Sequence, residues 1–133
     1  MKAWIDATIQ NARESGFVAT FTGRRRAVPE INSPNGNLRA FAERVAMNTP
    51  VQGGSADIIK RAMIDIHAKI KGSKDIILVL QVHDELVFEV KSGYEAEAAK
   101  LIKAGMENAF KLNIPLKADI KTGPNWQDMA PVS

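Results

Sequence analysis

Two adjacent carboxylates, Asp84 and Glu85, follow His83 between two apolar runs of the sequence. The runs, residues 76–82 and 86–91, have the composition of paired strands, so the three residues lie at the tip of a predicted hairpin. Tight turns favour Asn-Gly or Asp-Gly because they need a positive φ, and His-Asp-Glu offers no such backbone advantage. Carboxylates at a rigid strand end can coordinate a divalent cation. The tip is therefore a candidate metal site, and the alternative is a polar loop that keeps the hairpin soluble.

Three polar side chains at helical spacing form a second candidate site. Arg44 and Asn48 are four residues apart and share a helix face, and Gln52 follows four residues later, beyond Pro50. Such a donor-rich face can bind the minor-groove acceptors that every base pair offers, which reads duplex shape more than sequence. The alternative is a solvated helix end.

A basic run and a glycine pair flank this segment. The arginines 24–26 follow a predicted short strand, and they are either phosphate contacts or a basic surface loop. Gly53 and Gly54 allow a close backbone approach, and Ser55 is a candidate cap for the next helix.

The elements that position these residues form an α+β pattern. Apolar stripes predict helices, and alternating or β-branched runs predict strands. The predicted helices span about 4–12, 38–47, 59–70 and 94–112, and the predicted strands span 17–21, 76–82, 86–91 and 116–121. Pro50 is expected to end the second helix, and the continuous apolar run 76–82 is expected to be buried on both faces. We expect a single domain over 1–133, with helices packed on one face of a small antiparallel sheet.

The composition is that of a folded soluble domain. Hydrophobic residues make up 45% of the 133 residues and charged residues 25%, which argues against disorder. The absence of cysteine excludes disulfides and thiolate metal sites. No apolar run reaches the ~20 residues that span a bilayer, and the N-terminus does not have the pattern of a signal peptide, so we expect an intracellular domain without a membrane partner.

The net charge of +3 is unevenly distributed along the chain. Residues 1–74 hold 12 basic and 6 acidic residues, whereas residues 75–133 hold 6 basic and 9 acidic residues. A basic first half suits a polyanion such as a nucleic-acid backbone, and the alternative is a solvated surface with chance asymmetry.

Four segments carry a resemblance to a known family: Gly23 to Arg26 with Pro29, Arg44 to Gly53, Ala56 to Lys60, and Gln81 to Val87. In order and spacing the chain resembles the C-terminal palm and fingers part of family A DNA polymerases, of the DNA polymerase I type. The resemblance extends to Asn125-Trp126 near the end of the chain. It implies a partial polymerase palm that acts in template-directed DNA synthesis with two Mg²⁺ ions.

The resemblance also implies roles for the candidate residues. Asp84 would be a metal ligand, and Glu85 would support it beside the same site. His83 would contact the primer end. The minor groove of the primer–template would be contacted by Arg44, Asn48 and Gln52.

The implied partners are primer–template DNA, deoxynucleoside triphosphates in the complete enzyme, and the remainder of the polymerase, upstream in the same chain or as a split partner. The implied location is the cytoplasm, in association with the nucleoid. The family's other metal-binding aspartate and its nucleotide-binding helix have no counterpart in this sequence, so we expect the chain alone to be inactive. The alternatives are a non-catalytic DNA-binding module with the polymerase fold, and an unrelated metal-dependent hydrolase that uses Asp84 and Glu85.

Overall fold

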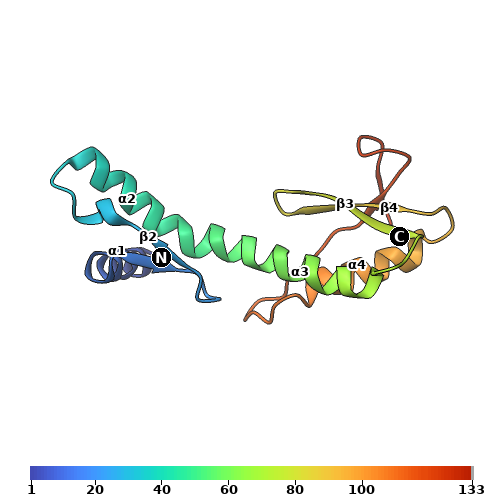
Figure 1. The fold of residues 1–133 in the computed structure, drawn as a ribbon, viewed down its shortest axis with the longest axis horizontal. Coiled ribbons are helices and arrows are strands. Elements are labelled where there is room, and N and C mark those ends of the chain that lie inside the picture. Colours follow the sequence, from blue (N-terminus) through green and yellow to red (C-terminus); the bar gives the residue numbers. More distant parts are fainter. Residues whose placement is uncertain (133) are drawn as a thin grey trace. The chain divides into compact units, whose positions relative to one another are not determined.

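The computed structural model describes residues 1–132, which form two compact units, one spanning Met1–Asp57 and the other beginning at Ile58 (Figure 1). Each unit combines helices with two-stranded antiparallel sheets, which confirms the predicted α+β class. Within residues 1–132, no helix is long and apolar enough to cross a membrane.

The first unit contains two α-helices, a small hairpin, a 3₁₀ turn, a π-helical turn and the start of a third α-helix. Its elements are α1 (Lys2–Ser15), β1 (Phe17–Ala19), β2 (Arg25–Ala27), the 3₁₀ turn η1 (Pro29–Asn32), α2 (Gly36–Asn48), the π-helical turn η2 (Thr49–Gly53) and the start of α3 (Gly54–Ile70). Gly16 ends α1 with a φ of 77°, a conformation that glycine adopts without steric cost. The side chain of Asn35 caps α2 by accepting from the amides of Asn37 and Leu38. The small apolar core comprises Ala12, Val18, Val28, Ile31, Ala42 and Ala46.

The sequence predicted that Pro50 ends the second helix. This prediction is wrong, because the chain remains helical beyond α2. Proline has no N–H to donate to the carbonyl four residues earlier. In a π-helical turn each amide instead donates to the carbonyl five residues earlier. The amide after the proline can therefore donate to the carbonyl that the proline leaves without a partner. The amide and hydroxyl of Thr49 both donate to the carbonyl of Val45, and the helix continues from α2 through η2 into α3 (Figure 1). Ser55 consequently lies inside α3 and is not its cap.

The second unit packs two helices against one hairpin. After the remainder of α3 come β3 (Ile76–Val82), β4 (Glu85–Val90), α4 (Glu95–Glu107), β5 (Lys121–Thr122) and β6 (Ala130–Pro131). The core comprises Ala62, Ile66, Ile70, Ile76, Ala98, Ile102 and Ala109, with the β4 side chains Leu86, Phe88 and Val90 packed against it. Gly105 lets α4 approach α3 closely, because a Cβ at this position would run into the side chain of Ile66. The helices therefore cover one face of the sheet, as predicted.

Strand β3 is not buried on both faces, contrary to its apolar sequence. Ile77 is 50% exposed and Val79 is 53% exposed, whereas Ile76 is buried. The reason is that α3 and α4 cover a single face of the hairpin, and no described residue forms a second layer. The sequence pattern identified a strand correctly but overstated its burial.

Two predicted elements are shorter than expected. Helix α4 ends at Glu107 and not near 112, because Asn108 turns the chain and its side-chain amide donates to the carbonyl of Ala104. The strand predicted over 116–121 is absent, apart from Lys121, which begins β5. Neither β3 nor β4 pairs with this segment, and a strand without a partner has no ladder to stabilise it.

Ile66 and Ile64 test the packing of α3, since both lie in the same helix but only Ile66 is fully buried. We expect Ile66→Ala to lower the free energy of unfolding by about 2–5 kcal/mol, because it leaves a cavity between α3 and α4. Ile64 is 63% exposed, and Ile64→Ala should change the same quantity by only about 0.5 kcal/mol. Urea denaturation followed by circular dichroism measures both, and equal losses would mean that α3 buries a different face.

Candidate nucleic-acid interface and candidate metal site

A β-bulge determines the loop of the β3–β4 hairpin. The register pairs Leu78 with Phe88 but Leu80 with Val87, so Val79 is an extra residue in β3. Beyond the bulge the pairing continues to Val82 opposite Glu85. The loop between the strands is thereby reduced to two residues, His83 and Asp84, and Glu85 begins β4 and does not lie in the loop. Bulges of this kind commonly re-aim side chains next to functional sites.

The loop places His83 in a strained backbone conformation. His83 has a φ of 53°, and it is the only non-glycine residue in the described chain with a positive φ. This is the first loop position of a two-residue hairpin, where glycine is usual because side chains disfavour positive φ. Gln81 donates its side-chain amide to the carbonyl of His83 at 2.5 Å and so holds the loop from the neighbouring strand. This strain agrees with the sequence analysis, which found that His-Asp-Glu lacks the residues that favour a tight turn.

Asp84 and Glu85 are exposed at the end of the hairpin. Their oxygens are the hard ligands that Mg²⁺ prefers, so the donor type fits this ion. Two carboxylates alone do not make a complete metal site. The described residues contain no group of three or more histidine, aspartate or glutamate side chains that could hold a metal. The hairpin thus fits part of a magnesium site and needs further ligands from outside it.

Arg44, Asn48 and Gln52 are all exposed, and all three lie along the continuous helix formed by α2 and η2. In a regular α-helix, residues four apart drift by about 40° around the axis, so three such residues spread over about 80°. The wider π-helical turn reduces the drift between Asn48 and Gln52. This irregular turn therefore brings Gln52 closer to the line of the first two residues. These three residues lie in the first unit, whereas the hairpin loop belongs to the second.

Arg24 forms hydrogen bonds to other residues of the first unit, although its side chain is 50% exposed. Its Nε donates to Asp57 Oδ1 at 2.8 Å, and its Nη2 donates to the carbonyl of Gly53 at 3.0 Å. The hydroxyls of Thr20 and Thr22 both donate to Asp57 Oδ2, at 2.7 and 2.5 Å. We call this set of five residues the Asp57 clasp. It joins the loop between β1 and β2 to the end of η2 and the first turn of α3.

The clasp changes the interpretation of the arginine run. The guanidinium of Arg24 uses two of its donors to bind Asp57 and Gly53, so its position is set by contacts within the protein. Arg25 lies over the ring of Phe17, at 4.6 Å from its centroid, and Arg26 is exposed. The sequence contained no sign of this arrangement, because the carboxylate partner lies 33 residues from Arg24.

The clasp lowers the pKa of Asp57 to about 2 from an ordinary value of 3.8. The hydrogen bonds from Thr22 and Thr20 are the largest causes, and Arg24 adds a further hydrogen bond and its positive charge. Burial acts in the opposite direction, since the side chain of Asp57 is only 11% exposed. The carboxylate is therefore ionised at all physiological pH values.

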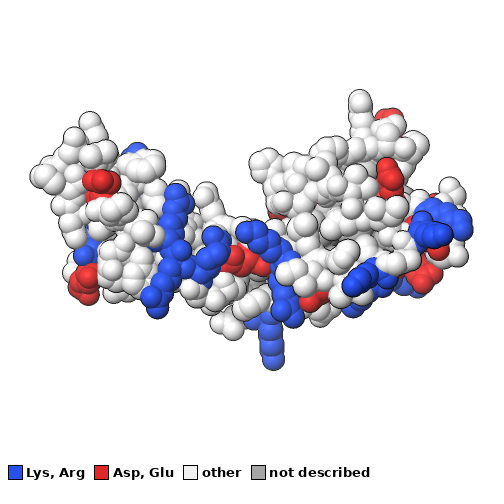
Figure 2. All heavy atoms as spheres, viewed as in Figure 1, with Lys and Arg blue, Asp and Glu red and all other residues white. Residues whose placement is uncertain are grey.

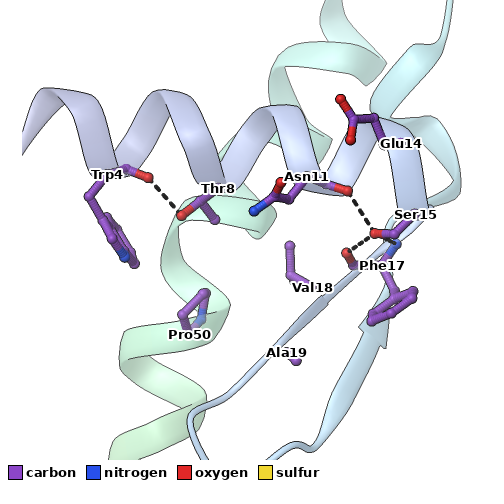
Figure 3. Close-up of a pocket in the computed structure, with 9 residues that line it drawn as sticks. All are labelled: Trp4, Thr8, Asn11, Glu14, Ser15, Phe17, Val18, Ala19 and Pro50. Atoms are coloured by element: carbon purple, nitrogen blue, oxygen red, sulfur yellow. Dashed lines mark hydrogen bonds between the residues drawn. The ribbon is translucent and has the colours of Figure 1, made fainter.

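An open hollow of about 590 Å³ lies in the first unit between α1, β1 and Pro50 (Figure 3). Trp4 and Phe17 line it, but the hydroxyls of Thr8 and Ser15 are already bonded to backbone carbonyls. Asn11 and Glu14 are the other polar residues that line the hollow.

The surface charge follows the elements. On the face drawn in Figure 2, basic side chains lie in the region of β2, over α3 and near α4, whereas the middle of the β3–β4 region is largely uncharged, with a few acidic groups. Lys60, Arg61 and Lys69 are exposed residues of α3. This distribution agrees with the basic excess of the first half of the sequence.

Comparison with known proteins identifies close relatives of the chain. Residues 1–128 match the model of the family described as DNA polymerase family A. DNA polymerase I of Bacillus subtilis (strain 168) is 49% identical over 129 residues, and that of Geobacillus stearothermophilus is 45% identical over 129 residues. Each alignment covers 96% of this chain but 15% of the relative, so the chain spans about 15% of the length of these curated relatives.

A solved structure has a similar fold. It is described as the POL domain of Pol1 from M. smegmatis in complex with DNA primer-template and dNTP. The superposition has a TM-score of 0.83 with 43% sequence identity, and it covers 87% of this chain and 21% of that chain.

The Asp57 clasp predicts a component of acid sensitivity. Because the folded-state pKa lies below the unfolded value, the clasp stabilises the fold above about pH 4 and loses this contribution as the pH falls toward about 2. We expect Asp57→Asn to be less stable than the parent at pH 6 and to lose less stability between pH 5 and pH 3. Urea midpoints across this range measure the effect.

Asp65→Asn is the matched control, since Asp65 lies on the same helix and pairs only with Arg61 one turn away. Its pH profile should run parallel to that of the parent. A profile for Asp57→Asn that also runs parallel would contradict the assignment.

Proposed function

Since the chain belongs to DNA polymerase family A, we propose that it forms part of an enzyme that performs template-directed DNA synthesis, a DNA-directed nucleotidyltransferase. The observation that carries the proposal is the family match over nearly the whole chain, at close to half identity with a DNA polymerase I. Its partners would be primer–template DNA, deoxynucleoside triphosphates and the rest of the polymerase. The similarity to a polymerase domain described with primer-template and dNTP supports the first two partners.

In this enzyme Arg44, Asn48 and Gln52 would bind the minor groove of the primer–template. Three features support the assignment: the side chains are exposed, they lie along one continuous helix, and arginine, asparagine and glutamine all donate hydrogen bonds. Minor-groove acceptors occur at every base pair, so these contacts would read duplex geometry and not sequence.

The β3–β4 loop would supply the metal-ligating carboxylate. Asp84 would hold Mg²⁺, Glu85 would support it, and His83 would contact the end of the primer. A pair of Mg²⁺ ions held there would supply activation of the primer 3′-hydroxyl and stabilisation of the leaving pyrophosphate. The short loop, the bulge and the bond from Gln81 support these roles, because they fix the carboxylate at the end of a rigid strand pair.

Asp84→Asn tests this role in a complete family A polymerase that contains this segment. We expect the rate of nucleotide incorporation to fall by at least about a hundredfold, because loss of a ligand should exceed the 10–100-fold cost of losing an outer-shell partner. The dissociation constant for primer–template should change by less than about threefold. Single-turnover extension and fluorescence anisotropy measure the two quantities.

Glu89→Gln is the matched control, because Glu89 is an exposed carboxylate in the same hairpin, opposite Ile77 and away from the loop. It should leave both quantities unchanged. Near-normal incorporation by Asp84→Asn would refute the metal-ligand assignment.

We further propose that the 133-residue chain by itself does not catalyse extension. Two neighbouring carboxylates bind Mg²⁺ weakly, since this ion keeps its water ligands unless several hard ligands converge. Purified chain mixed with primed template, Mg²⁺ and all four nucleotides should give no extension above that of an Asp84→Asn preparation. Extension by the parent that is lost in Asp84→Asn would show that the chain is sufficient. Extension by both would identify a contaminating polymerase.

A further inference from the structure

The Asp57 clasp holds the backbone of η2 at the residue that follows Gln52. The guanidinium of Arg24, in the β1–β2 loop, donates two hydrogen bonds, one to the carboxylate of Asp57 and one to the carbonyl of Gly53. The side chain of Asp57 is only 11% exposed and Thr20 is 5% exposed, whereas the Arg24 side chain is 50% exposed and closes the clasp from the solvent side. Its elements are fixed relative to each other by charge-assisted hydrogen bonds, which are stronger than neutral ones.

We propose that Arg24 is a positioning residue that sets the orientation of Gln52 by holding the π-helical turn. The inference rests on the proposed function, since it gives Gln52 its contact with the primer–template. Gln52 is exposed, and its side chain makes no hydrogen bond to the described residues, so its direction is set by the backbone of η2. The clasp fixes this backbone from outside the helix.

The two glycines after Gln52 make this contact possible. A Cβ on Gly53 would lie 2.7 Å from Thr20 Cγ2 and 3.2 Å from Arg24 Nη2. A Cβ on Gly54 would lie 2.5 Å from Phe21 Cε1. Side chains at these positions would push the β1–β2 loop away from the helix. The glycines thus serve the close approach of one protein segment to another.

The π-helical turn needs such support because Pro50 removes an amide donor from its start. A turn of this kind is rare, and it is less favourable than regular α-helix without additional contacts. The planar guanidinium binds Asp57 through Nε and the Gly53 carbonyl through Nη2, whereas the donors of a lysine ammonium all share one nitrogen. Arginine at position 24 is therefore specific to the clasp.

A double-mutant cycle between Arg24 and Gln52 tests the inference in a complete polymerase that contains this segment. Arg24→Lys preserves the net charge, so the nonspecific attraction to DNA is unchanged. We expect Arg24→Lys to raise the primer–template dissociation constant about three- to tenfold, the cost of one or two misplaced hydrogen bonds. In the Gln52→Ala background the same change should have less than a twofold effect, because the side chain that it positions is gone.

Arg25→Lys is the matched control, since Arg25 is the adjacent arginine and lies over Phe17 outside the clasp. It should change the dissociation constant by less than twofold in either background. Thr22→Val is a milder second variant, which removes one hydrogen bond to Asp57 from an exposed residue and should act in the same direction as Arg24→Lys. It keeps the test decisive if Arg24→Lys folds poorly.

The outcomes separate the inference from the function on which it rests. If Gln52→Ala weakens binding but Arg24→Lys and Thr22→Val weaken it equally with and without Gln52, or not at all, Arg24 does not act through Gln52 and the inference is wrong. If Gln52→Ala binds the primer–template as tightly as the parent, the minor-groove assignment fails, and the inference fails with it.

Discussion

The missing amide hydrogen of Pro50 is the constraint on which the first unit depends. It prevents a regular α-helix at this point, and the chain responds with a π-helical turn that carries the helix from α2 into α3. The turn contains Gln52 and so affects the direction in which this side chain projects. It also presents the Gly53 carbonyl to Arg24, so the proline, the glycines and the arginine form one dependent set.

The second unit contains a comparable irregularity at its own candidate site. One extra residue, Val79, shifts the pairing of β3 and β4 and leaves only His83 and Asp84 in the loop. His83 then adopts a positive φ that its side chain disfavours. In both units the departures from regular geometry lie next to the residues to which we assign chemistry, which is where such departures are expected in proteins.

The sequence predicted most elements because their apolar spacing reflects the face that each one buries. It failed where the outcome depends on contacts distant in sequence. Pro50 was expected to end a helix by a local rule, yet the clasp and the widened turn override it. The segment 116–121 has strand composition but no neighbouring strand. The apolar run of β3 was correctly identified as a strand, although its second face has no cover among the described residues.

The sequence suggested which residues form the candidate site, but it did not indicate the contacts that hold them in place, and the arginines illustrate why. Motif resemblance pointed to Asp84 and Gln52, whereas the pairing of Arg24 with Asp57 joins residues 33 positions apart and depends on the fold. In residues 1–74, three of the six acidic side chains pair with arginines: Glu43 with Arg13, Asp57 with Arg24, and Asp65 with Arg61. Nine basic and three acidic residues there form no ion pair in the described chain. The net charge is unchanged, but the groups outside ion pairs are more uniformly positive than the composition indicates, because the paired carboxylates are locally neutralised.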